Sequence, residues 1–382
     1  MSRFKKIHKS LLISIIISSQ LTSSVNALDS VNTIQSKNTR NYTIKNQTEN
    51  EIDEEVTNFV ANIFNIKSKA IQTNDLDTME NIYDTNTNVG KCAYEYEVRK
   101  VKYINNWAEK QGVKFIDIIP NAVIKRAKTN DSISTYTVMC NTEYKYVYLD
   151  EPEKINSSYI GTFHYLQLKH KDDEWLITKE WYTDPFADSL SLENIKTDSI
   201  KEYILNQKER DFTNIDDRRK GAVEYAFKYC GSASDGENDY KYNKKYKNFN
   251  PEGGDCANFA SQVLFEGGKF KKNGSWNYNK GDAAAAWINA GKFTHYMLYS
   301  GRASLISHGN YEKVYKDSYK LLPGDFIAYE KKGDITHVSM VTGADSKGYT
   351  LVTCHNTDRR SVPWDLGWSD KQMKFYLIRV NY

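Results

Sequence analysis

The sequence predicts an α+β fold in two parts, because each part shows helical patterns first and strand-like runs after them. In the first part, apolar residues recur at helical spacing from Ile52 to Ile63, and four alternating runs follow. In the second part, helical patterns again come first, and three strand-like runs lie between Pro323 and Arg360. Helices followed by consecutive strands favour an α+β architecture over alternating α/β units.

The first 50 residues predict a signal peptide and a linker. Residues 1–27 combine a basic start, an apolar run at 11–19 and small residues before Leu28. The apolar run is too short to span a bilayer comfortably, and a retained membrane anchor is the alternative. Residues 28–50 are rich in Ser, Thr and Asn without an apolar period, which is typical of a linker. We therefore expect a secreted or cell-wall-associated protein with no stable membrane span after signal removal.

Composition argues against a nucleic-acid partner. The chain has 382 residues, of which 40% are hydrophobic and 26% charged, so it has material for more than one core. Removing residues 1–27 removes four of the 52 basic residues and leaves 48 against 49 acidic ones, so the formal charge moves from +3 to −1. A nearly neutral mature chain gives no support for a nucleic-acid partner.

Residues 51–187 are predicted to form an N-terminal α+β domain of unknown role. Two helical stretches precede alternating runs at 114–127, 132–149, 160–173 and 174–186. This order, and above all the ending DDEWLITKEWYTDPF, weakly resembles the cone-shaped fold of the nuclear-transport-factor type, in which helices pack in a curved sheet. The resemblance implies a fold and no activity.

No catalytic constellation is evident in this first domain. Glu180 and Asp184 could form a paired acid site, but we expect them to be solvated charges on an edge strand. His164 and His170 share one face of a strand, and we expect surface histidines rather than ligands. Residues 188–212 are polar and helical in pattern, and we interpret them as a connector to a second domain at 213–382.

The chain has five cysteines that could form disulfides or remain as free thiols: Cys92, Cys140, Cys230, Cys256 and Cys354. An odd number in an exported chain leaves at least one free thiol. Cys92 and Cys140 lie in one region and could form a disulfide, which the sequence alone does not decide. No Cys or His spacing matches a zinc site, so we expect no metal.

Cys256 is the candidate nucleophile. Gly253 and Gly254 favour a tight turn, and a helix is predicted from Ala257 to Glu266. A cysteine at the start of a helix lies beside unpaired backbone N–H groups that favour the thiolate and can donate to an oxyanion. A buried structural cysteine is the alternative.

A thiol nucleophile needs a base and a group that orients the base. His337 opens the second of the three strand-like runs, and His355 and Asn356 end the third. Side chains alternate along a strand, so His355 and Asn356 cannot both point toward His337 unless the strand bulges. The order of cysteine, histidine and polar residue is the one that papain-like hydrolases need.

Residues 216–382 resemble the putative amidase domain of secreted Gram-positive proteins, which is related to the CHAP and NlpC-type cell-wall peptidases. The patches that carry the resemblance are DRRKGAVEYAFKYC, GDCANFASQVLFEGG, AWINAGKF, PGDFIAY, THVSMVTG and VTCHNTDRR. The resemblance covers somewhat less than half of the chain and implies a papain-like α+β hydrolase domain. In this chain an alanine follows Cys256 where a small hydroxyl residue is common.

The resemblance implies a role for each matching residue. Cys256 would be the nucleophile, His337 its general base and acid, and His355 the orienting group, with Asn356 as a rival for that third position. Asp255 would shape the site without transferring protons. Trp364 and Trp368, near the last strand-like run, are candidates for substrate contact.

These residues predict an exported cysteine amidohydrolase that needs no cofactor. The substrate class implied by the resemblance is peptidoglycan, cut either as an N-acetylmuramoyl-L-alanine amidase or as a stem-peptide hydrolase. The alternatives are a thiol peptidase or acyltransferase acting on other extracellular substrates, and a non-catalytic extracellular binding protein. The oligomeric state is left open.

Overall fold

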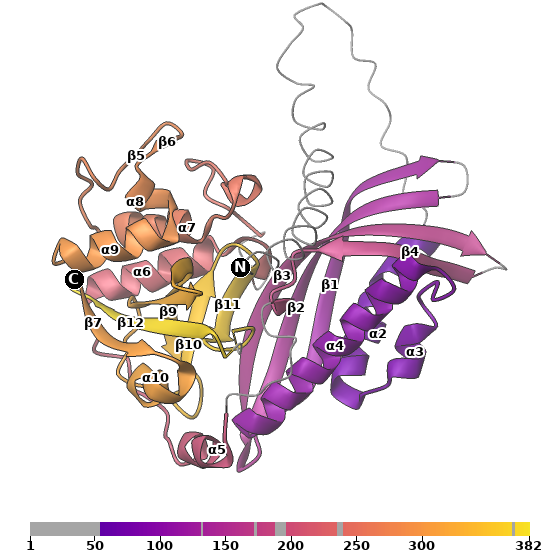
Figure 1. Ribbon diagram of the computed structural model, residues 1–382, viewed down its shortest axis with the longest axis horizontal. Coiled ribbons are helices and arrows are strands. Elements are labelled where there is room, and N and C mark those ends of the chain that lie inside the picture. The colour runs from indigo at the N-terminus through magenta and orange to yellow at the C-terminus, as the bar shows by residue number, and fades with distance from the viewer. Residues whose placement is uncertain (1–53, 131–132, 172–173, 188–195, 235–239, 369–370) are drawn as a thin grey trace, which may run out of the picture. The chain divides into compact units, whose positions relative to one another are not determined.

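The computed structural model describes residues 54–130, 133–171, 174–187, 196–234, 240–368 and 371–382 (Figure 1). The predicted signal peptide at 1–27 and the linker at 28–50 lie outside the described residues, as does the start of the connector. No helix within the described ranges is long and apolar enough to cross a membrane.

Three helices open the first part: α2 (Glu54–Thr73), α3 (Leu76–Glu80) and α4 (Asn88–Gln111). Helix α4 begins after Thr87, whose hydroxyl accepts a backbone hydrogen bond, and ends at Gly112 in the left-handed conformation. Val56, Val60 and Ile63 of α2 are buried, as the helical spacing of these residues predicted.

Four long antiparallel strands follow: β1 (Val113–Asn130), β2 (Ile133–Tyr148), β3 (Glu151–Lys171) and β4 (Glu174–Tyr182). They pair in chain order, and Figure 1 shows α2 and α4 lying along one face of the curved strands. The predicted α+β fold of this part, with helices packed against a curved antiparallel sheet, is confirmed.

The second part begins with helices as predicted, but three strands precede its last helix. Its helices are α5 (Asp198–Leu205), α6 (Asp217–Lys228), α7 (Cys256–Gln262), α8 (Ala285–Ile288), α9 (Ala290–Tyr299) and α10 (Tyr311–Ser318), with short helical turns η3 (Gly231–Ala233), η4 (Asn250–Glu252) and η5 (Val263–Gly267). Its strands are β5 (Tyr278–Asn279), β6 (Asp282–Ala283), β7 (Ala303–Gly309), β8 (Phe326–Lys331), β9 (Asp334–Ala344), β10 (Thr350–Cys354), β11 (Asp358–Pro363) and β12 (Met373–Val380).

One antiparallel sheet runs through both parts in the order β1-β2-β3-β11-β10-β9-β8-β12-β7, with β4 paired to β3. The join is made where Gly161 of β3 pairs with Asp358 of β11. Residues alternate between two cores, so Val338 and Met340 of β9 pack with α7, whereas Val341 packs with the core that includes α2 and α4.

Two expectations about the first part were wrong. His164 and Asp184 are buried, and the carboxylate of Glu180 is 2% exposed, so these groups are not solvated surface charges. The two carboxylates can be buried because Lys67 and Lys100 of the overlying helices supply opposite charges.

No disulfide links the first-part cysteines. Cys92 is exposed, Cys140 is buried, and both carry free thiols. The pairing that the sequence left open is therefore not formed in this structure.

The join between the two parts leaves no room for a side chain at Gly161. A Cβ atom there would lie 2.3 Å from the backbone carbon and 2.4 Å from the backbone oxygen of Ser232 in η3. We expect Gly161→Ala to lower the free energy of unfolding by about 1–3 kcal/mol, because the backbone must shift. Gly343→Ala in β9, where a Cβ meets nothing within 4 Å, is the matched control and should change stability little. Urea unfolding of both variants measures this, and equal effects would contradict the prediction.

Candidate active site around Cys256

The backbone before Cys256 turns through two glycines and begins a helix at the cysteine itself. Gly253 and Gly254 have φ values of 110° and 133°, which side chains rarely adopt, and α7 then starts at Cys256. The Asn356 amide covers this turn, since a Cβ on Gly254 would lie 2.9 Å from its Nδ2 atom. The predicted placement of the cysteine at a helix start is therefore observed.

The Cys256 thiol is buried against β9. Its residue is 6% exposed, and the backbone N–H groups of Val338 and Ala257 lie near the sulfur. Burial raises the pKa of the thiol to about 12, although both N–H groups oppose this shift. Desolvation thus outweighs the stabilisation of the thiolate by the helix start, and the resting sulfur is a protonated thiol at neutral pH.

His337 lies on β9 itself, and its ring is on the face of the strand opposite α7. Its Nε2 atom is 3.2 Å from the hydroxyl of Ser339, and its ring stacks on Trp368 with 5.0 Å between centroids. Burial lowers the pKa of His337 to about 3, and the nearby Arg359 guanidinium adds to the shift, so the imidazole is neutral. Next to it in the chain, Val338 faces α7, which gives the alternation expected along a strand.

His355 is held between two oxygen atoms beside the helix start. Its Nδ1 atom lies 2.7 Å from Oδ2 of Asp255, and its Nε2 atom lies 2.7 Å from the backbone oxygen of Tyr229. Both partners only accept hydrogen bonds, so both ring nitrogens must donate and the ring is an imidazolium. Burial alone would lower its pKa, but the Asp255 hydrogen bond and the nearby Asp358 raise it above its ordinary value.

Asp255 anchors the start of α7 from both sides. Its Oδ1 atom accepts hydrogen bonds from the backbone N–H of Phe249 and from the Asn258 amide, at 2.9 and 2.8 Å. Its Oδ2 atom pairs with His355, whose ring stacks on Phe259 of α7 with 4.0 Å between centroids. The carboxylate and the imidazolium therefore fix the helix start against the end of β10.

The structure brings some predicted residues together and keeps others apart. Asp255, Cys256 and His355 lie around the start of α7, with Asn356 over the preceding turn. Neither imidazole is hydrogen-bonded to the Cys256 thiol, and His355 contacts Asp255 rather than His337. All of these residues belong to the described part of the chain.

The two tryptophan candidates differ in position. Trp364 is fully buried and stacks on Tyr311 in the core, so it does not reach a surface where a substrate could contact it. Trp368 is half-buried and lies on the His337 ring. Of these two tryptophans, Trp368 alone remains a candidate for substrate contact.

Sequence reasoning missed a second carboxylate behind His355. Oδ2 of Asp358 accepts hydrogen bonds from the backbone N–H and the hydroxyl of Ser232, at 2.8 and 2.6 Å, and from the Tyr242 hydroxyl. The Tyr242 ring also meets His355 edge-on. The signal was faint, because Tyr242 lies in a polar stretch and Asp358 begins a strand, β11, that the sequence analysis did not identify.

The comparisons with known proteins concern the second part of the chain most directly. Residues 216–378 match the sequence model of a family described as "Putative amidase domain". Two Bacillus subtilis (strain 168) proteins are similar: "Uncharacterized protein YhbB", 31% identical over 160 residues, and "Uncharacterized protein YjcM", 30% identical over 171 residues. The matches cover 38% and 42% of this chain and 43% and 36% of those proteins, so the chain spans less than half of either relative.

Among solved structures, the chain is similar to a "Putative NTF2-like transpeptidase" from Campylobacter jejuni, at 16% identity and a TM-score of 0.18. It is also similar to an NTF-2-like protein of unknown function from Shewanella oneidensis, at 16% identity and a TM-score of 0.19. The matches cover 32% and 33% of this chain and 96% and 98% of those chains.

Proposed function

We propose that residues 216–378, which match the amidase-domain model and so suggest an amidase-type hydrolase, form a cysteine-dependent amidase acting on peptidoglycan outside the cell. The observation that carries the proposal is the Cys256 thiol at the start of α7, with the N–H groups of Ala257 and Val338 at its sulfur. A nucleophile surrounded by backbone donors suits attack on a carbonyl, because the same donors can hold the oxygen that becomes negative.

The first proposed step moves the thiol proton to His337. A neutral imidazole can accept a proton, but burial lowers the pKa of His337 to about 3, so the ring must leave its buried resting place before it is basic enough to take the thiol proton. Because the ring faces the other side of β9 in this structure, the backbone at the start of that strand must turn with it to bring the imidazole to the sulfur. A bound substrate that displaces Trp368 would free the ring for this turn.

The thiolate then attacks the amide carbonyl and forms a carbon–sulfur bond. His337 returns its proton to the departing nitrogen, the carbon–nitrogen bond breaks, and an amine leaves. Water attacks the remaining thioester and regenerates the thiol while the acyl group leaves as a carboxylic acid. His355 takes no part in these proton transfers, because both of its nitrogens donate to fixed oxygen atoms; it positions α7 through Asp255.

Peptidoglycan as the substrate rests on two expectations from the sequence. The predicted signal peptide directs the chain out of the cell, and the resemblance of residues 216–382 is to an amidase domain of secreted proteins. Peptidoglycan lies outside the cell membrane and contains amide bonds, so it fits both expectations.

Mass spectrometry of fragments released from purified peptidoglycan tests the proposal. The unaltered chain should release fragments whose new ends identify the bond, and Cys256→Ala should release none. Cys92→Ala is the matched control, because that cysteine is exposed in the first part and should leave release unchanged. Release by Cys256→Ala would refute the thiol mechanism, and no release by any of the three would refute peptidoglycan as the substrate.

A further inference from the structure

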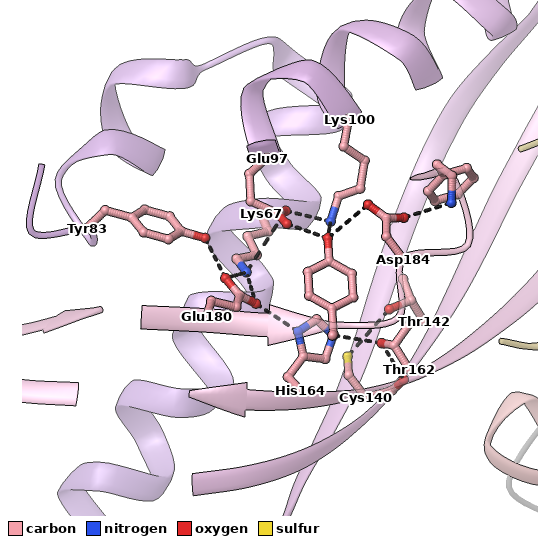
Figure 2. Close-up of polar contacts among 12 residues, drawn as sticks. Lys67, Tyr83, Glu97, Lys100, Cys140, Thr142, Thr162, His164, Glu180 and Asp184 are labelled. Atoms are coloured by element: carbon pink, nitrogen blue, oxygen red, sulfur yellow. Dashed lines mark hydrogen bonds and ion pairs between the residues drawn. The ribbon is translucent and has the colours of Figure 1, made fainter. Parts of the chain in front are cut away.

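The first part of the chain contains a buried group of charged and polar side chains beneath α2 and α4. Figure 2 shows Lys67, Glu97 and Lys100 reaching from the helices toward His164 and Glu180 on the strands. Nothing in the proposed amidase chemistry uses this group, and it belongs to the part of the chain outside the amidase-domain match.

Side chains of both charges lie in this group. Lys67 lies 2.5 Å from a carboxylate oxygen of Glu180 and 4.0 Å from one of Glu97, and Lys100 lies 2.5 Å from Glu97. Burial lowers the pKa of His164, although its hydrogen bond to Glu180 opposes this, so the ring adds no charge at neutral pH. Two ammonium groups thus face three carboxylates, because Asp184 also lines the cavity, and a charged ligand of either sign would meet a like charge there, Asp184 or Lys100.

A cavity of about 50 Å³ lies against this group and is lined by both polar and apolar side chains. The polar ones include Lys100, Thr142 and Asp184, and the apolar ones include Phe64, Ile71 and Phe186. A water molecule needs roughly 10–15 Å³ of such volume, so the cavity has room for about four non-hydrogen atoms. A ligand group that fits must be small, with a polar end and an apolar end.

Asp184 retains capacity to accept a hydrogen bond. Its Oδ1 atom accepts the backbone N–H of Phe186 at 2.8 Å, and its Oδ2 atom lies 3.3 Å from the Tyr182 hydroxyl. That hydroxyl has one hydrogen, which it also directs at Glu97. Tyr96 is within hydrogen-bonding reach as well. A carboxyl group has about four acceptor positions, so a further N–H donor can be received.

We propose that this cavity binds an uncharged acetamido group of the kind carried by N-acetylated amino sugars. The group has four non-hydrogen atoms, and its N–H can donate to Asp184 while its carbonyl accepts from the Lys100 ammonium, which has three donors and two partners within the group. Its methyl packs against Phe64, Ile71 and Phe186. In a cell-wall amidase this would hold the glycan strand, a consequence that rests on the proposed function; the binding itself does not.

The test uses the full chain with ¹³C-labelled histidine rings and follows their NMR signals during addition of three sugars. N-acetyl-D-glucosamine should shift the His164 signal, whereas D-glucosamine and D-glucose should not. His170, exposed on the same strand, is the matched reporter and should stay unshifted. Shifts confined to His337 or His355 would assign the sugar to the Cys256 site and overturn the inference, whatever the chain does to peptidoglycan.

A variant pair on β2 supplies a second measurement. Thr142→Leu fills the cavity and should weaken binding of N-acetyl-D-glucosamine at least tenfold, whereas Thr137→Leu on the opposite face of the strand should not. If Thr142→Leu fails to fold, the titration of the unaltered chain with the three sugars still tests the proposal. No His164 shift, an equal shift with D-glucose, or an equal shift with the cationic D-glucosamine would each overturn the proposed ligand class.

Discussion

Removal of the His337 imidazole is expected to slow amide hydrolysis by roughly 10²–10⁴-fold. Removal of the imidazole and the Cys256 thiol together is expected to be no worse than removal of the thiol alone. Groups that act as a unit give strongly non-additive losses, because the second change removes a partner that no longer functions. The comparison needs His337→Ala, Cys256→Ala and the double variant, with kcat measured on a soluble peptidoglycan fragment.

The structure makes this a demanding test, because His337 and Cys256 are not in contact at rest. The imidazole is engaged by Ser339 and Trp368, and the thiol lies at the Val338 N–H on the other face of β9. Ser339→Ala should leave most activity intact, since it only releases the ring from its resting partner.

His295→Ala is the matched control for the histidine change. His295 is exposed on α9 in the same part of the chain, so its loss should leave kcat unchanged. If His337→Ala keeps more than a tenth of the rate while His355→Leu abolishes it in a folded protein, the base is His355 and the proposed mechanism is wrong.

The elements of the fold were predictable because their signals are local. The helical spacing of Val56, Val60 and Ile63 gave the buried face of α2, and the glycines before Cys256 gave the turn that starts α7. The alternating runs predicted β9, which contains His337, and β10, which ends just before His355. Each of these features is determined by residues within a few positions of one another.

The directions and partners of the site residues were not predictable, because they depend on contacts distant in sequence. The register of β8 with β9 shifts between Tyr329 and Glu330. Tyr329 pairs with His337, so this irregularity affects which face of the sheet the His337 side chain is on. The imidazolium of His355 depends on the carboxylate of Asp255, a hundred residues earlier. The burial of Glu180 depends likewise on Lys67, so its edge-strand pattern was misleading.

The second large effect concerns stability. Two buried histidines, His355 and His164, should contribute to the free energy of unfolding with opposite dependence on pH. His355→Leu should lower the free energy of unfolding by about 3–5 kcal/mol in acid, because it leaves Asp255 as a buried charge with one partner fewer. The folded-state pKa of His355 is raised above the unfolded value of about 6.5, so its contribution is complete below that pH. The contribution is lost as the pH rises through the raised pKa.

His164 should behave in the opposite way, although it also lies against a carboxylate. Its Nδ1 atom contacts Glu180, but its Nε2 atom meets the Thr162 hydroxyl, which can donate, so the ring is satisfied while neutral. Its folded-state pKa is lowered, so its contribution is present above about pH 6.5 and is lost as the pH falls toward the lowered pKa. Urea unfolding of the unaltered chain, His355→Leu and His164→Leu at pH values below, near and above about 6.5 gives both differences. The loss of unfolding free energy in each variant is compared across pH. If both losses change with pH in the same direction, the assignment of His355 as an imidazolium is contradicted, because only a ring that gains a proton on folding becomes less stabilising as the pH rises.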